Sequence, residues 1–112
     1  METKNAVVAL AALASNSRLE VYRLLVQAGP TGLSAGHIAE VTGLPASTLS
    51  FHLKELVQAG LVKSRQESRY VIYTANYSAM SELIGFLTEN CCQGEPCAAV
   101  PTNGCTSCGD ES

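Results

Sequence analysis

Apolar residues in the first ninety positions recur mostly at helical spacing, with one strand-like stretch between the last two helices. The spacing predicts five helices, over residues 4–14, 16–28, 35–42, 44–59 and 77–90. The stretches "LVKSRQ" and "RYVIYTA" separate the fourth helix from the fifth and have the β-branched and aromatic content of strands. We expect them to form a hairpin that turns around Glu67 and Ser68.

Capping residues agree with these bounds. We expect Asn16 or Ser17 to cap the second helix, Ser34 the third and Asn76 the last. Gly29, Gly43 and Gly60 stand where the second, third and fourth helices should end. The first helix is apolar on nearly all sides, which predicts that it is buried, in part against a partner subunit. The last helix carries an apolar stripe, made of Tyr77, Met80, Leu83, Ile84 and Leu87.

A short helix, a tight turn containing Gly43 and a longer helix form a helix-turn-helix arrangement, and a hairpin directly after it makes a winged one. The predicted fold class is therefore mainly α with a small β-hairpin, a winged helix-turn-helix that forms a dimer. On the longer helix, a spacing of 100° per residue places four apolar residues on the core face: Leu49, Leu53, Leu56 and Val57.

The opposite face of the longer helix and the hairpin hold the candidate DNA contacts. Phe51 points away from the core face, where a groove surface can place it against a thymine methyl. Short hydroxyls near the helix start can approach bases or phosphates, and basic side chains flank the hairpin tip. The candidates are Ser47, Thr48, Ser50, Phe51, His52, Lys54, Arg65 and Arg69. For each residue taken alone, the alternative is an ordinary solvated surface position.

Charge is distributed unevenly along the 112 residues. The net charge is −3, which by itself argues against a protein that binds nucleic acid. Residues 47–73 carry four basic and two acidic side chains, a balance of +2, whereas residues 74–112 carry five acidic side chains and no basic one. The acidic excess belongs to the C-terminal part, and the predicted DNA-reading part is locally basic.

All five cysteines lie in the stretch "NCCQGEPCAAVPTNGCTSCGD". The odd number and the acidic residue Glu2 at the chain start argue against an exported protein, although an apolar run ending in Ala-Leu-Ala formally resembles a signal peptide. We expect a buried helix there, reduced thiols and a cytoplasmic location. No apolar run has the length of a membrane span. No arrangement of His or carboxylates accompanies the thiols, so an enzyme is not expected.

The stretch from residue 13 to residue 76, and "STLSFHLKELVQAGLV" most specifically, resembles the winged-helix domain of the ArsR/SmtB family of metal-responsive bacterial repressors. The resemblance covers residues 10–90. It implies a homodimer packed through its first and last helices, bound to an inverted-repeat operator in double-stranded DNA, with lower DNA affinity when inducer binds. The domain organisation expected is a DNA-binding and dimerisation domain at 1–90 and a metalloid-binding tail at 91–112.

Cys91, Cys92 and Cys97 resemble the site of those arsenite repressors whose three thiols follow the last helix. The family's other arsenic site would need cysteines in "LSAGHIAE", and its zinc site would need His on the last helix; this chain has neither. As(III) is soft and forms three bonds, so three thiolates saturate it, and Sb(III) should fit the same site. The predicted function is thus an arsenite-responsive repressor with As(III) or Sb(III) as inducer.

Cys105 and Cys108 are expected to be an auxiliary or dispensable pair. They would otherwise complete a four-thiolate Zn or Cd site or act as a redox pair. The functional alternatives are accordingly a Zn/Cd- or thiol-redox-responsive repressor of the same fold, or a thiol metal carrier that binds no DNA. A thiol-rich tail without a specific ligand is the remaining alternative.

Overall fold

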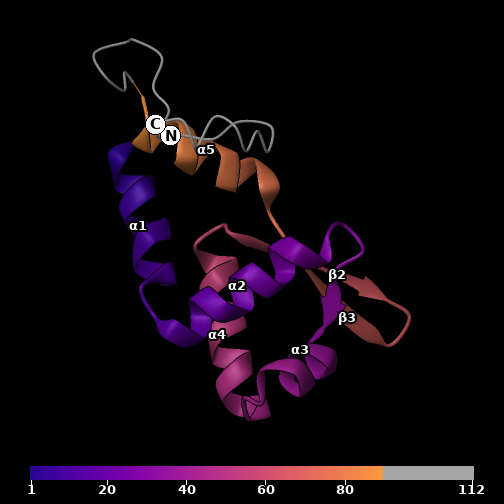
Figure 1. Cartoon of the computed structure of the whole chain (residues 1–112). Coiled ribbons are helices and arrows are strands. Elements are labelled where there is room, and N and C mark those ends of the chain that lie inside the picture. Colours follow the sequence, from indigo (N-terminus) through magenta and orange to yellow (C-terminus); the bar gives the residue numbers. More distant parts are fainter. Residues whose placement is uncertain (90–112) are drawn as a thin grey trace, which may run out of the picture.

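The computed structural model describes residues 1–89. Within that range the chain forms five helices and three short strands around one core (Figure 1). In chain order the elements are α1 (Thr3–Leu13), α2 (Asn16–Ala28), β1 (Leu33–Ser34), α3 (Ala35–Thr42), α4 (Ala46–Gln58), β2 (Val62–Glu67), β3 (Tyr70–Ala75) and α5 (Tyr77–Leu87). The predicted winged helix-turn-helix is confirmed. The same range holds no helix with the length and apolar character that crossing a bilayer requires.

Two of the three predicted N-caps are confirmed and one is wrong. The Ser34 hydroxyl accepts from the His37 amide at 3.2 Å, and the Asn76 side chain accepts from the Ala79 amide at 3.3 Å. The second helix is capped by Ser15, not by Asn16 or Ser17. Ser15 has an extended backbone, with φ −146° and ψ 132°, and its hydroxyl accepts from the Arg18 amide, so Asn16 is already the first helical residue.

The sheet contains a strand that the sequence did not reveal. The predicted hairpin is present as β2 and β3, and Ser68 at its turn has a φ of 57°. The additional strand β1 has two residues and pairs with β3, Leu33 opposite Tyr73, so the order is β1-β3-β2. A strand of two residues is too short to show the alternation of apolar and polar residues by which strands are predicted from sequence. The strand exists because β3 lies beside it.

Leucines from three parts of the chain, namely α2, α4 and the residue before β2, form the centre of the core. Leu25, Leu49, Leu56 and Leu61 are almost completely buried, which confirms most of the predicted core face of α4. Val57 is a correction, because 37% of its surface is exposed. It stands at the edge of the apolar arc and lines an open groove between α4 and the hairpin.

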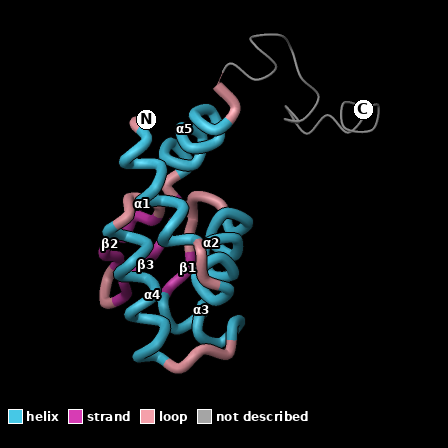
Figure 2. The backbone as a smooth tube through the Cα atoms, turned by 90° about the vertical axis from the view of Figure 1, so that its left-hand side faces the viewer, coloured by secondary structure: helices cyan, strands magenta, loops and turns pink. Residues whose placement is uncertain are grey.

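The first and last helices lie together at one end of the molecule, far from α3 (Figure 2). The expectation that α1 is buried all round does not hold within one chain, since only Ala6 and Ala9 are buried. Val7 and Leu10 are exposed on α1, as are Ile84 and Leu87 on α5. One chain therefore leaves an apolar surface on this end, which we call the α1/α5 surface after these four residues.

Gly32 allows the turn after α2 to lie against the sheet. Its φ is +71°, and a Cβ atom there would lie 2.5 Å from the Tyr73 carbonyl oxygen and 2.6 Å from Thr74 Cγ2. Gly43 has a similar φ of +76° but open space around it.

We expect Gly32→Ala to lower the free energy of unfolding by about 2–4 kcal/mol, through backbone strain plus overpacking. Gly43→Ala is the matched control, because it carries the strain alone and should cost about 1 kcal/mol. Urea denaturation of both variants measures the difference. Equal losses of stability would show that the close approach to β3 is unimportant.

Candidate nucleic-acid interface

The turn between α3 and α4 is set by three local features. Gly43 adopts the left-handed conformation and donates its amide to the Ala39 carbonyl oxygen, which ends α3. The Thr42 hydroxyl donates to the Ile38 carbonyl oxygen at 2.7 Å. Pro45, with a φ of −62° and an extended ψ of 149°, is the N-cap residue directly before α4. These features set where α3 ends and where α4 begins.

The face of α4 opposite its leucines is open to solvent. Phe51 stands out, because 54% of a large apolar side chain is exposed there. Its ring lies 5.8 Å from the His52 ring, centroid to centroid, with the planes tilted by 58°. The predicted contacts Ser47, Thr48, Ser50 and Lys54 are all exposed on the same helix. An apolar ring between short hydroxyls and a cation suits the major groove, where methyl groups and hydrogen-bonding edges alternate.

His52 lies at the edge of this face and is half-buried. Its Nδ1 atom is buried and has no hydrogen-bond partner among the described residues. That leaves Nε2 as the ring nitrogen that a phosphate oxygen can reach.

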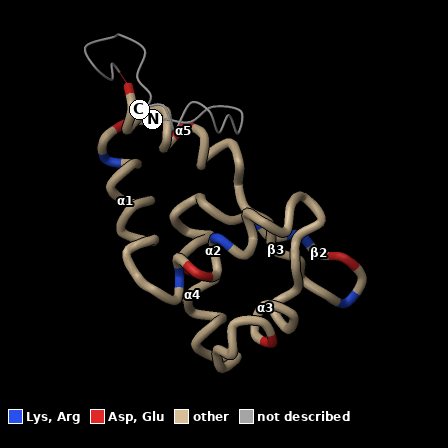
Figure 3. Tube along the Cα trace, in the orientation of Figure 1, with Lys and Arg blue, Asp and Glu red and all other residues tan. Residues whose placement is uncertain are grey.

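The hairpin carries basic and acidic residues close together (Figure 3). Arg69 is exposed in the turn between β2 and β3 and makes no ion pair with any residue in the range 1–89. Arg65 is also exposed, but its Nε donates to Glu67 Oε2 at 2.8 Å, and its two other nitrogens donate to backbone carbonyls. Arg65 and Arg69 were predicted together as DNA contacts at the hairpin, but their surroundings differ.

A groove of about 360 Å³ separates α4 from the hairpin. Its lining residues are Ser50, Leu53, Lys54, Val57, Gln58, Ser64 and Tyr73. Two of them, Ser50 and Lys54, were predicted contacts, whereas Ser64 and Tyr73 were not. Only the packing of the hairpin against α4 brings these two beside the helix, so no local sequence signal pointed to them.

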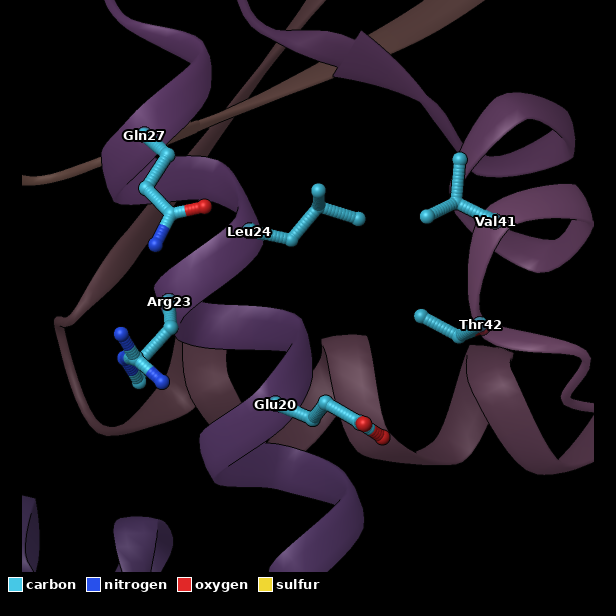
Figure 4. Close-up of a pocket in the computed structure, with 6 residues that line it drawn as sticks. All are labelled: Glu20, Arg23, Leu24, Gln27, Val41 and Thr42. Atoms are coloured by element: carbon cyan, nitrogen blue, oxygen red, sulfur yellow. The ribbon is translucent and has the colours of Figure 1, made fainter.

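A second depression, of about 220 Å³, lies between α2 and α3, away from the predicted contacts (Figure 4). Leu24 of α2 points toward Val41 and Thr42 of α3, and Glu20 lies beside them. Its mixed, open lining contains no buried polar side chain.

The predicted metalloid ligands Cys91, Cys92 and Cys97, and the auxiliary Cys105 and Cys108, all lie outside the described residues. Within residues 1–89, no three His, Cys, Asp or Glu side chains come together as a metal site. His37 and His52, the two histidines of the chain, belong to different helices.

Comparisons with known proteins agree with this geometry. Residues 13–65 match the family model of a helix-turn-helix domain. The chain is 30% identical to the HTH-type transcriptional regulator YgaV of Escherichia coli K12 over 89 residues, 80% of this chain and 88% of the relative.

Two solved structures share the fold. Reduced HlyU from Vibrio cholerae is 34% identical, with a TM-score of 0.64 over 81% of this chain and 93% of that one. A homodimeric winged helix-turn-helix domain from Mycobacterium bovis, described as a possible ArsR-family regulator, is 25% identical, with a TM-score of 0.62 over 82% and 85% of the two chains.

Proposed function

Because the chain belongs to the ArsR-type winged-helix family of transcriptional regulators, we propose that it is a homodimeric repressor whose inducer is arsenite or antimonite. In this proposal the dimer binds an inverted-repeat operator. Cys91, Cys92 and Cys97 of each subunit bind the metalloid, and the operator is released.

The exposed face of α4 is the observation that carries the DNA-binding part. Phe51 contacts a thymine methyl, and Ser47, Thr48 and Ser50 reach base edges or phosphates. His52 Nε2, Lys54 and Arg69 contact phosphates. The leucines on the other side of α4 anchor this face rigidly to the core, which a reading helix requires.

The α1/α5 surface supports the homodimer. Four exposed apolar residues on two adjacent helices cost free energy in water, and a second copy covers them without a new partner. The related domain from Mycobacterium bovis is homodimeric. A two-fold dimer would present its two α4 helices to successive major grooves, about 34 Å apart.

The position of the thiols supports the metalloid part. Cys91 and Cys92 follow α5 within four and five residues of its last residue, Leu87. Three thiolates complete the coordination of As(III), so the site needs no nitrogen or oxygen ligand. Since α5 belongs to the proposed dimer surface, a ligand bound at its end can change the relative position of the two α4 helices.

A thiol-redox switch is the second candidate, favoured by the Cys105-x-x-Cys108 spacing and by similarity to a HlyU structure that is described as reduced. In that case two thiols would form a disulfide, giving two protons and two electrons to an added oxidant such as a peroxide. A Zn or Cd response would use the same pair together with earlier cysteines.

Footprinting on the DNA upstream of the gene, with and without arsenite, tests the proposal. We expect two protected half-sites about one helical turn apart, and loss of protection with arsenite. Protection that survives arsenite but is lost with peroxide would replace the metalloid switch by the redox switch. Absence of any protected site at low salt would refute the DNA-binding function.

The role of Phe51 gives a prediction about base readout. We expect Phe51→Ala to weaken operator binding by about tenfold, roughly 1.4 kcal/mol, because the apolar side chain no longer meets a thymine methyl. Replacing the contacted thymine by uracil removes only that methyl. This substitution in the DNA should weaken operator binding by the unmodified protein but should not change operator binding by Phe51→Ala.

Leu19→Ala is the control for this pair of measurements. Leu19 is an exposed leucine of α2, outside α4 and the hairpin, and its truncation should not change operator affinity. At each thymine, the effect of uracil on operator affinity is compared between the unmodified protein and Phe51→Ala. If the two proteins lose the same affinity at every position, Phe51 does not read a methyl group.

A further inference from the structure

We propose that Arg65 is a positioning residue that clamps the hairpin to the turn after α2, and that the DNA contact of the hairpin is left to Arg69. This inference rests on the proposed DNA-binding function. It assigns different roles to two arginines that are indistinguishable in the sequence pattern.

Three hydrogen bonds from the guanidinium group carry the inference. Nε donates to Glu67 Oε2 at 2.8 Å, on the same strand. Nη2 donates to the Thr31 carbonyl oxygen at 3.0 Å, and Nη1 to the Pro30 carbonyl oxygen at 3.4 Å. The two carbonyls are 34 and 35 residues away in the chain, so these bonds join separate parts of the fold.

The strand order explains why Arg65 can reach this turn. Arg65 of β2 is paired with Ile72 of β3, and Ile72 is paired with Ser34 of β1. The side chain therefore crosses β3 to reach the backbone just before β1. A guanidinium group has the length and the planar fork for this span, with donors that diverge toward separate acceptors.

The turn at residues 29–32, which we call the α2–β1 turn, is a rigid acceptor. The Gly32 amide donates to the Gly29 carbonyl oxygen at 3.1 Å, and the Pro30 ring restricts the backbone between them. Gly32 lies directly against β3. The end of α2 before the turn is held in addition by Tyr77, whose hydroxyl donates to the Val26 carbonyl oxygen at 3.0 Å. The clamp thus ties β2 to a turn that has anchors of its own, through Gly32 against β3 and through α2 and Tyr77.

Charge argues against Arg65 as the phosphate contact. Three of its five N–H groups have acceptors, and the Glu67 carboxylate beside it offsets its charge and repels a phosphate. The ion pair is exposed on both sides, so its contribution to overall stability is small and its effect is on orientation. Arg69 makes no ion pair within the described part of the chain and is one of the two residues of the hairpin turn.

Paired conservative substitutions in the full-length homodimer test this division of roles. Lysine keeps the charge but not the fork, so Arg65→Lys should weaken operator binding by about five- to tenfold, nearly as much as Arg65→Gln. Arg69→Lys keeps the charge that a phosphate contact needs, so it should weaken operator binding clearly less than Arg65→Lys does. Arg69→Gln should weaken binding and lower the salt dependence, by about 0.9 in slope for each phosphate that is no longer neutralised.

A double variant distinguishes indirect from direct action. If Arg65 acts through the position of Arg69, Arg65→Gln should add little further weakening to Arg69→Gln. Effects that multiply, or an Arg65→Lys variant that binds like the unmodified protein, would overturn the clamp and make Arg65 a phosphate contact.

A measurement without DNA separates this inference from the proposed function. Amide hydrogen exchange in residues 66–70 should be faster in free Arg65→Lys than in free Arg69→Lys, because only the former releases the hairpin. Equal exchange rates would refute the clamp even if DNA binding is established. Faster exchange together with no DNA binding by the unmodified protein would support the clamp and refute the proposed function.

Discussion

Replacing Cys91 by serine is expected to leave operator affinity unchanged and to abolish the release of DNA by arsenite. A serine hydroxyl is a hard ligand that stays protonated near neutral pH, so it does not replace a thiolate on As(III). With two thiolates left, the metalloid cannot join the three cysteine positions into one unit. The coupling of about 3 kcal/mol that would lower operator affinity roughly a hundredfold is then absent.

Fluorescence anisotropy of a labelled operator, titrated with arsenite, measures this release. Cys97→Ser should behave like Cys91→Ser. Cys105→Ser is the matched control and should release DNA at the same arsenite concentration as the unmodified protein. A Cys91→Ser variant with a normal response would refute the three-thiolate site, and loss of response in Cys105→Ser would favour the Zn/Cd or redox alternatives.

Introducing a carboxylate on the α1/α5 surface is expected to break the homodimer and, with it, operator binding. Val7 is 58% exposed in one chain, and in the proposed dimer it is covered by the partner. Burial of an unpaired carboxylate there costs several kcal/mol, so Val7→Glu should be monomeric at micromolar concentration. A monomer binds only one half-site of the operator. Because the contribution of the second half-site is lost, operator affinity should fall by about a hundredfold or more.

Val41→Glu provides a closely matched control for this prediction. Val41 is 56% exposed and belongs to α3, the helix at the other end of the molecule from α1 and α5 (Figure 2). Sedimentation velocity and operator affinity should be unchanged in this variant. If Val7→Glu remains dimeric and binds DNA normally, the two subunits meet through another surface.

Most of the fold was predictable because its signals are local. Helical spacing, a Gly after each of three helices and the hydroxyl or amide caps Ser34 and Asn76 depend on neighbouring residues only. The exposed position of Phe51 followed from the same spacing, since its distance from the leucines of α4 determines the face on which it lies. The cap of α2 was placed wrongly because Ser15, Asn16 and Ser17 all favour a cap position, and residue type alone does not say which of them has the extended backbone.

The sequence by itself determined the winged helix-turn-helix, the exposed face of α4 and the spacing of the thiols after the last helix, because each depends on residues close together in the chain. Only the tertiary structure decided that Leu33 and Ser34 form a strand, that Val57 faces a groove and that Arg65 binds two carbonyls of the α2–β1 turn. These three features require β3 and α4 to bring together segments that lie far apart in sequence. Spacing along the chain carries no information about such neighbours, and packing alone supplies it.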